Sequence, residues 1–173
     1  MREYPIEDDR IVDLAVLKAD FMPTPAYIEA HKGLVIPCHD VIIQYEGGAL
    51  LVMRTDFPAK DILWPIGGRV ERGMPIEESL KKKVRKESGL ELDEITELGY
   101  ARTYFRTDPW GHGKGTDTIN FMFFAQGKGT FQLDKTVAQP TIVLPDQYTL
   151  EFWQSLHPYV QDFMDIVVPL IKK

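Results

Sequence analysis

Residues 64–90, WPIGGRVERGMPIEESLKKKVRKESGL, join a glycine-rich turn to a charged amphipathic segment. At about 100° per residue, Ile76, Leu80 and Val84 fall on one face, which predicts a helix over residues 76–88. Gly89 is a suitable stop for this helix, because glycine readily takes the left-handed conformation of a C-cap. Glu87 lies about 20° from Ile76 on the same wheel, so its carboxylate is expected on the apolar side.

Lys83 falls on that apolar side as well, while Lys82 and Arg85 point away from it. An inward carboxylate is costly unless a cation or hydrogen-bond donors meet it. Two interpretations of Glu87 therefore stay open. Either Lys83 and Glu87 form an i, i+4 ion pair, or Glu87 meets a metal ion held against the glycine turn.

The 173 residues fit a single domain, and 44% hydrophobic and 27% charged residues are ordinary values for a globular protein. The net charge of -6 argues against a nucleic-acid partner, since such proteins normally present a basic face. It is compatible with a small anionic ligand held by a few arginines. Cys38 is the only cysteine, which excludes an intramolecular disulfide and predicts a small core residue.

The first ten residues, MREYPIEDDR, are acidic and lack the apolar core of a signal peptide. No window approaches about 18 consecutive apolar residues, so we expect no membrane span and no membrane partner. The expected location is the cytoplasm.

Apolar and β-branched runs predict two pairs of strands, at residues 34–45 and 49–54 and at residues 94–106 and 116–129. The turn Glu-Gly-Gly joins the first pair into a hairpin, and the polar loop 107–115 joins the second. Strands, a glycine-rich loop and helices in this order indicate the α/β or α+β class, with a mixed sheet covered by helices.

The other segments carry weaker signals. Residues 10–20 fit a short helix or a strand equally well, and residues 26–33 read as a short helix. Residues 55–68 and 128–148 are expected to be loops. Residues 150–173 predict one or two helical segments, interrupted by Pro158 and Pro169.

Residues 67–90 resemble the Nudix box, G-x5-E-x7-R-E-U-x-E-E-x-G-U, where U is a bulky apolar residue. With Gly68 on the first glycine, the closing pair falls on Gly89 and Leu90 without a gap. The box is altered at four positions, namely Met74 for the first glutamate, Lys82 for the arginine, and Lys83 and Lys86 for two clustered glutamates. The resemblance implies the Nudix fold, a mixed β-sheet sandwiched between helices.

One branch, the GDP-mannose mannosyl hydrolases, also keeps only the last glutamate of that cluster. The chain is similar to this branch in RTDFPAKDILWPIGGRV (54–70), GTDTINFMFF (115–124) and LPDQ (144–147). The similarity runs over residues 36–153 of a single Nudix domain, 1–173, and leaves residues 1–33 as an N-terminal extension. It implies hydrolysis of a nucleotide sugar such as GDP-mannose to a nucleoside diphosphate and free sugar, and a possible homodimer.

Carried over by position, the metal ligands of this branch fall on the Gly67 carbonyl, Glu87 and Gln147. These are oxygen donors, which suit Mg²⁺ or Mn²⁺. Lys83 would place an ammonium near that metal, where it would weaken metal binding or contact a phosphate.

The two arginines that stabilise the leaving group in this branch fall on Arg54 and Arg69, and a guanidinium fork suits a diphosphate. An aspartate near the sugar falls on Asp40. Tyr148 stands where the branch has its histidine base, and His112 in loop 107–115 is the candidate replacement. Two alternatives stay open, namely ordinary pyrophosphate cleavage and a catalytically inactive Nudix-fold binding or interaction module.

Overall fold

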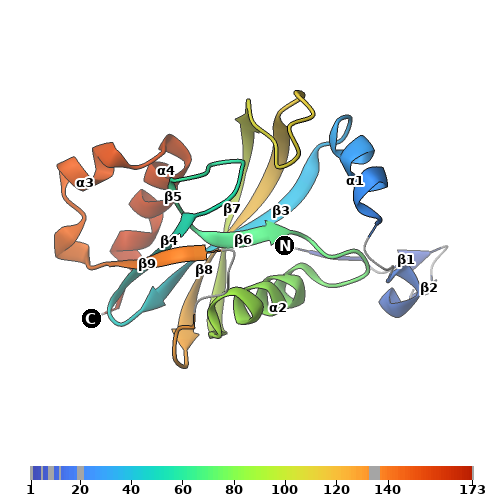
Figure 1. Cartoon of the computed structure of the whole chain (residues 1–173). Helices are drawn as coiled ribbons and strands as arrows, with labels where there is room; N and C mark the ends of the chain where they lie inside the picture. The colour runs from blue at the N-terminus through green and yellow to red at the C-terminus, as the bar shows by residue number, and fades with distance from the viewer. Residues whose placement is uncertain are drawn as a thin grey trace.

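The computed structural model describes residues 2–4, 6–7, 10–11, 13–18, 22–132 and 137–172. Within these residues, a seven-stranded mixed sheet forms the centre of the molecule (Figure 1). Its strands are β3 (Ile36–Tyr45), β4 (Gly48–Arg54), β5 (Leu63–Trp64), β6 (Ile66–Arg69), β7 (Glu91–Phe105), β8 (Thr116–Lys128) and β9 (Val137–Val143). The main path runs β5-β4-β3-β8-β7, while β6 pairs with β3 and β9 pairs with β4. Strands β3 and β8 are parallel, and the other pairs are antiparallel.

The predicted hairpins are confirmed. Strands β3 and β4 meet at Glu46 and Gly47, which both have positive φ angles, as a tight hairpin turn requires. Strands β7 and β8 pair from Glu91 to Phe105, so the loop between them holds residues 106–115.

The sheet has an apolar layer on each face, because successive side chains of a strand point to opposite sides. On β3, Val41 and Ile43 pack with the buried residues of α2 (Ile76–Ser88). Ile42, between them, packs with α4 (Pro158–Val167) on the other face. The expected mixed sheet covered by helices is confirmed.

Helix α2 has the predicted bounds and the predicted face. Leu80 and Val84 are fully buried, and Gly89 forms a left-handed C-cap with φ of 71°. At the other end, the backbone N–H of Ile76 donates to the carboxylate of Glu3 at 3.1 Å. A carboxylate is favourable there because it meets the positive end of the helix dipole. The N-terminal extension therefore helps to fix the helix of the box.

Two predicted loops proved wrong. Residues 55–68 contain β5 and most of β6, and residues 128–148 contain β9 and the 3-10 helix η2 (Pro145–Gln147). Pro140 made the sequence of β9 look like a loop, because proline lacks the N–H that a central strand needs. It is accommodated beside a bulge, where the register shifts between Val52 and Met53 of the partner strand. Strands β5 and β6 are two and four residues long, too short for a periodic signal.

The N-terminal extension holds short elements: β1 (Ile6–Glu7), β2 (Arg10–Ile11), η1 (Leu14–Leu17) and α1 (Thr24–His31). Helix α1 agrees with the predicted short helix. Residues 10–20 are part strand and part 3-10 helix, although Val12, Ala19 and Asp20 lie outside the described residues. The tail forms α3 (Leu150–Ser155), α4 and η3 (Val168–Leu170), and Pro158 begins α4. No helix in the described ranges is long and apolar enough to cross a membrane.

Candidate active site

A cleft of about 460 Å³ opens where α1, α2, the central strands and the loop after β4 meet. Backbone and side chains of both the N-terminal extension and the box line it. Its charged lining residues, histidine aside, are Asp40, Asp56, Glu87, Arg54, Arg69 and Lys83. Six of the residues expected at the site are therefore brought together, namely Asp40, Arg54, Gly67, Arg69, Lys83 and Glu87.

Asp40 lies on β3 directly opposite Gly67 of β6. A Cβ atom on Gly67 would collide with the Asp40 carboxylate and with the carbonyl oxygen of His39. Gly67, the first glycine of the Gly67–Gly68 pair, is therefore required for steric reasons. The missing side chain makes the room in which the Asp40 carboxylate sits.

The Asp40 carboxyl is 5% exposed, and its Oδ2 accepts a hydrogen bond from the Tyr159 hydroxyl at 2.8 Å. Burial raises the pKa of Asp40 to about 6. The hydrogen bond from Tyr159 and the positive charges of Arg54 and Lys83 lower this pKa and so oppose the effect of burial. The result is a carboxylate that is mostly ionised at neutral pH yet basic enough to take a proton.

Lys83 and Glu87 form the i, i+4 pair that the helical phase allowed. The Lys83 Nζ lies 2.6 Å from Glu87 Oε1, and the Glu87 side chain is only 12% exposed. The Lys83 side chain crosses the box turn, where a Cβ on Gly68 would lie 2.9 Å from Lys83 Cε. The ammonium thus sits inside the cleft beside the carboxylate.

The oxygen donors expected for a metal ion do not gather around one point. Gln147 is not among the residues lining the cleft, and its side-chain oxygen accepts the Leu144 N–H at 3.1 Å. Glu87 is already paired with an ammonium. Among the described residues, no group of three or more His, Cys, Asp or Glu side chains is placed to hold a metal ion. The expected ligand set is therefore incomplete in this structure, since Gln147 lies outside the cleft and the Glu87 carboxylate is paired with Lys83.

Arg54 ends β4 and is half-buried in the cleft wall. Its Nε donates to the carbonyl oxygen of Pro58 at 2.9 Å, which ties the guanidinium to the following loop. Asp61 N also donates to the Arg54 carbonyl, closing the loop at 3.0 Å. Arg54 is therefore held in one orientation along the cleft.

Arg69, at the end of β6, stacks its guanidinium carbon 3.9 Å above the ring centre of Tyr27. Such a cation–π contact helps to hold the guanidinium in place over the ring. Because Tyr27 belongs to α1, a helix outside the Nudix-like region orients one of the two expected phosphate-binding arginines.

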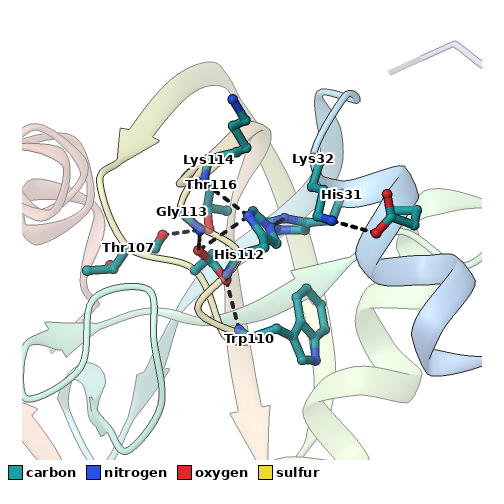
Figure 2. A network of polar contacts seen from close by, with 10 residues as sticks. His31, Lys32, Thr107, Trp110, His112, Gly113, Lys114 and Thr116 are labelled. Carbon is teal, nitrogen blue, oxygen red and sulfur yellow. Dashed lines mark hydrogen bonds and ion pairs between the residues drawn. The ribbon is translucent and has the colours of Figure 1, made fainter.

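His112 does not line the cleft, although His31 and Trp110 beside it do. Figure 2 shows the His31 and His112 rings side by side, with His31 Nδ1 2.8 Å from His112 Nε2. His112 Nδ1 accepts the backbone N–H of Lys114 at 3.1 Å and lies 3.4 Å from Asp108 Oδ2. Both ring nitrogens of His112 are thereby engaged.

The same loop is closed by Asp108. The side chains of Asp108 and His112 are each 3% exposed, and Asp108 Oδ1 accepts the backbone N–H groups of Trp110 and His112 at 2.9 and 3.0 Å. Trp110 in turn meets the rings of Tyr27 and His31 edge-on, with ring centres 5.1 and 5.0 Å apart. The loop and α1 form one aromatic unit at the mouth of the cleft.

Tyr148 and Cys38 take no part in acid–base chemistry at neutral pH. The Tyr148 hydroxyl donates to Asp165 at 2.7 Å on the α3–α4 side, and burial together with this carboxylate raises its pKa. Burial raises the pKa of the Cys38 thiol to about 12. The expectation of Cys38 as a small core residue is confirmed, since it is buried in β3.

Neutral polar side chains lie deeper in the cleft. Thr103 and Thr118 share a hydrogen bond of 2.6 Å between their hydroxyls, and Asn120 Nδ2 donates to Thr103 at 3.0 Å. All three residues are at least 92% buried and line the cleft. They supply hydroxyl and amide groups without charge.

Sequence reasoning missed Tyr159, Tyr27, His31 and Trp110. No motif marks them, and the aromatic residues looked like ordinary core or surface positions. They share only their position in the chain. Each lies in the N-terminal extension, in loop 107–115 or in the C-terminal tail, outside the predicted strands.

Comparisons with known proteins agree with this architecture. The NUDIX domain family model matches residues 38–163. The low-salt glycan biosynthesis protein Agl8 of Haloferax volcanii is 24% identical over 130 residues, which is 73% of this chain and 78% of that protein.

Solved structures show the same fold at low identity. A NUDIX hydrolase from Nitrosomonas europaea superposes with a TM-score of 0.62 at 17% identity, covering 80% of this chain and 92% of that one. The NUDIX domain of Shewanella oneidensis NrtR, complexed with ADP ribose, superposes with a TM-score of 0.60 at 13% identity, covering 86% and 99%. Since the family model spans well over half of its residues, the chain belongs to the NUDIX domain family.

Proposed function

We propose that this protein hydrolyses a nucleoside diphosphate derivative, and specifically a nucleotide sugar, to a nucleoside diphosphate and a free sugar. The observation that carries the proposal is one cleft in which two fixed guanidinium groups, Arg54 and Arg69, lie with a buried carboxylate, Asp40, of raised pKa. Membership of the NUDIX family implies a hydrolase. That the substrate is a nucleotide sugar is a more specific proposal, and the groups that line the cleft support it.

Two relatives favour a sugar-containing ligand. The similar protein from Haloferax volcanii is named for glycan biosynthesis. The NUDIX domain of NrtR binds ADP ribose, in which a diphosphate joins a nucleoside to a second sugar. Both fit a cleft that holds arginines for the diphosphate and neutral polar groups for hydroxyls.

Arg54 and Arg69 are assigned to the diphosphate. A guanidinium donates two parallel hydrogen bonds to phosphate oxygens, and both side chains are oriented by the protein, through the Pro58 carbonyl and the Tyr27 ring. When the bond to the sugar breaks, negative charge grows on the departing nucleoside diphosphate. Donors that are already in place stabilise that charge without reorganisation.

Asp40 is assigned the role of the base that takes a proton from the attacking water. A general base works well when its pKa lies near the operating pH, and burial has raised this one to about 6. Tyr159 donates to Oδ2 and so fixes the plane of the carboxylate. Thr103, Thr118 and Asn120 are assigned to the sugar hydroxyls.

Many NUDIX hydrolases use divalent metals such as Mg²⁺, and the resemblance places donors on Gly67, Glu87 and Gln147. The donors in this structure do not support that ligand set, because Gln147 lies outside the cleft and Glu87 is paired with Lys83. The steps above therefore use only the residues of this chain. On the resemblance alone we also propose a homodimer, which sedimentation would report as twice the mass of the chain.

Product analysis tests the proposal. The protein is incubated with GDP-mannose and with other purine and pyrimidine nucleotide sugars, in ¹⁸O water, and the products are separated and weighed. The expected products are a nucleoside diphosphate and a free sugar carrying the ¹⁸O label, since water attacks the anomeric carbon. The variant Asp40→Asn is the control for contaminating activity.

Other products would overturn the assignment. Sugar phosphate and nucleoside monophosphate with label on a phosphate would mean ordinary pyrophosphate cleavage. Tight binding of the nucleotide sugars without turnover, in the presence or absence of Mg²⁺, would mean a catalytically inactive binding module.

A further inference from the structure

Lys83 occupies the cleft in a way that the surrounding lysines of α2 do not. Its side chain is 32% exposed, against 59% for Lys82, which points outward to pair with Glu71. The Lys83 chain lies over Gly68, where a Cβ would be 2.9 Å from Cε and 3.1 Å from Nζ. A glycine at position 68 is therefore what lets this lysine lie flat across the turn.

Glu87 holds the other end of the Lys83 side chain. The Nζ–Oε1 distance of 2.6 Å is short, and burial of Glu87 reduces the competition from water. An ammonium has three N–H donors, of which this contact uses one. The other N–H groups of Lys83 can donate to a ligand. Their direction is set by the contact with Glu87, which is held on α2.

The charge of Lys83 acts on the floor of the cleft. Lys83 lines the cleft together with Glu87 and with the buried Asp40 of β3, so its ammonium shares this space with both carboxylates. The charged residues that line the cleft, with His31 left out, balance as three acidic and three basic. A dication entering this balanced cleft would have to displace the ammonium from Glu87 or meet its repulsion.

We propose that the Lys83 ammonium is the resident cation of the cleft: paired with Glu87, it binds a phosphate of the ligand where a divalent metal ion would otherwise bridge, so this chain binds nucleotides without a divalent metal. The identity of the ligand as a nucleoside diphosphate rests on the proposed function. The role of Lys83 as the cation rests on the contacts with Gly68 and Glu87.

The inference makes a reciprocal prediction about position 83. A glutamate there would remove the ammonium and place a second carboxylate one turn before Glu87 on the same helix face. Two carboxylates four residues apart can share a divalent cation. Lys83→Glu should therefore convert metal-independent binding into metal-dependent binding.

Calorimetric titration of the full chain with GDP, ADP and UDP, each in EDTA and in excess Mg²⁺, provides the test. We expect the wild-type affinity for at least one nucleotide to differ by less than threefold between EDTA and Mg²⁺. Lys83→Met should weaken that affinity by tenfold or more in EDTA. The matched control is Lys86→Met, which removes the same charge from an exposed position of the same helix outside the cleft, and it should stay within twofold.

A second readout does not involve nucleotide. Binding of Mn²⁺ to the ligand-free protein is followed by the electron paramagnetic resonance signal of free Mn²⁺. Wild type and Lys83→Met should leave this signal unchanged, because Glu87 alone is a poor site, while Lys83→Glu should reduce it. Thermal melting of each variant shows that it is folded.

The outcomes separate the two proposals. Wild-type nucleotide binding that requires Mg²⁺, or equal losses in Lys83→Met and Lys86→Met, overturns the role of Lys83 and leaves the proposed hydrolase standing. Failure to bind any of the three nucleotides in either condition overturns both proposals.

Discussion

The cleft is built from two unlike parts. The charged part consists of Asp40 on β3, opposite Gly67 of β6, and of Lys83 and Glu87 on α2; strand register and helix phase place these groups. The aromatic part consists of Tyr27, His31 and Trp110, on α1 and in the loop before β8, and contacts between side chains place each of its rings.

The two parts should tolerate substitution to different degrees. Backbone hydrogen bonds and the sheet core hold the charged part, so a change there either collides with the backbone or removes a reacting group. The aromatic part is held by ring contacts and by the His31–His112 hydrogen bond, which are individually worth about 1 kcal/mol. Changes in the charged part should therefore be the more severe.

The largest effect is expected at Asp40. Asp40→Asn keeps the shape and can still accept the Tyr159 hydrogen bond, but it cannot take a proton. The turnover number should fall about 10²–10⁴-fold, the usual contribution of a general base. The measurement is kcat for the nucleotide sugar, and a kcat near the wild-type value would remove Asp40 from the mechanism.

The same substitution has an opposite effect on stability. The folded pKa of Asp40, about 6, lies above the ordinary aspartate value of 3.8, so the folded protein binds this proton more tightly than the unfolded chain. The wild type is thus relatively destabilised above pH 6, and this cost is relieved as the pH falls toward 4. Asp40→Asn should melt at a higher temperature than the wild type at pH 7.5, and the difference should shrink at pH 4.5.

The next largest effect is expected at Gly67. Gly67→Ala forces a Cβ into the Asp40 carboxylate and the His39 carbonyl, both of which are held by the sheet. A loss of about 1–3 kcal/mol in the free energy of unfolding is expected, as for other overpacked positions. Urea denaturation measures it. The control is Gly33→Ala, where no heavy atom lies within 4 Å of the new Cβ, and a loss as large there would contradict the steric explanation.

A smaller effect is expected from the aromatic part. Tyr27→Leu removes the ring beneath Arg69, a contact worth about 0.5–2 kcal/mol. The Kd for a nucleoside diphosphate should rise by about 3–20-fold, with little change in kcat, because Arg69 is still present but less well oriented. Tyr100→Leu is the matched control, since Tyr100 is 72% exposed on β7, and it should leave Kd unchanged.

The smallest effect is a pH dependence at His31. Burial and the neighbouring His112 lower the pKa of His31 below its usual value. The unfolded chain therefore takes up this proton first, and the folded state loses relative stability as the pH falls below about 6.5. Unfolding free energies at pH 7.5 and 5.5 should differ more in the wild type than in His31→Gln. An equal difference in the wild type and in His31→Gln would mean that another group causes the pH dependence.

Prediction from sequence succeeded where a single element carries its own signal. The face and the C-cap of α2 follow from Ile76, Leu80, Val84 and Gly89 alone, and the structure confirms them. It failed at β9, because Pro140 interrupts the local strand pattern. The strand forms through its pairing with β4, which is distant in the sequence. Pairing partners are set by distant residues, so no local window contains them.

In the cleft, local sequence was enough to predict only the helical half of the charged part: Glu87 and Lys83 share a helix face because of the 100° period, and the glycines of the box precede that helix by a fixed distance. The remaining contacts of the cleft come from the packing of elements that are distant in the sequence. Tyr159 forms a hydrogen bond with Asp40, which lies 119 positions earlier in the sequence. His31 and His112, which form another, are 81 positions apart. The physical reason is that periodicity records which face of an element is buried, whereas contacts between elements depend on how the sheet and helices pack, which no short stretch of the chain encodes.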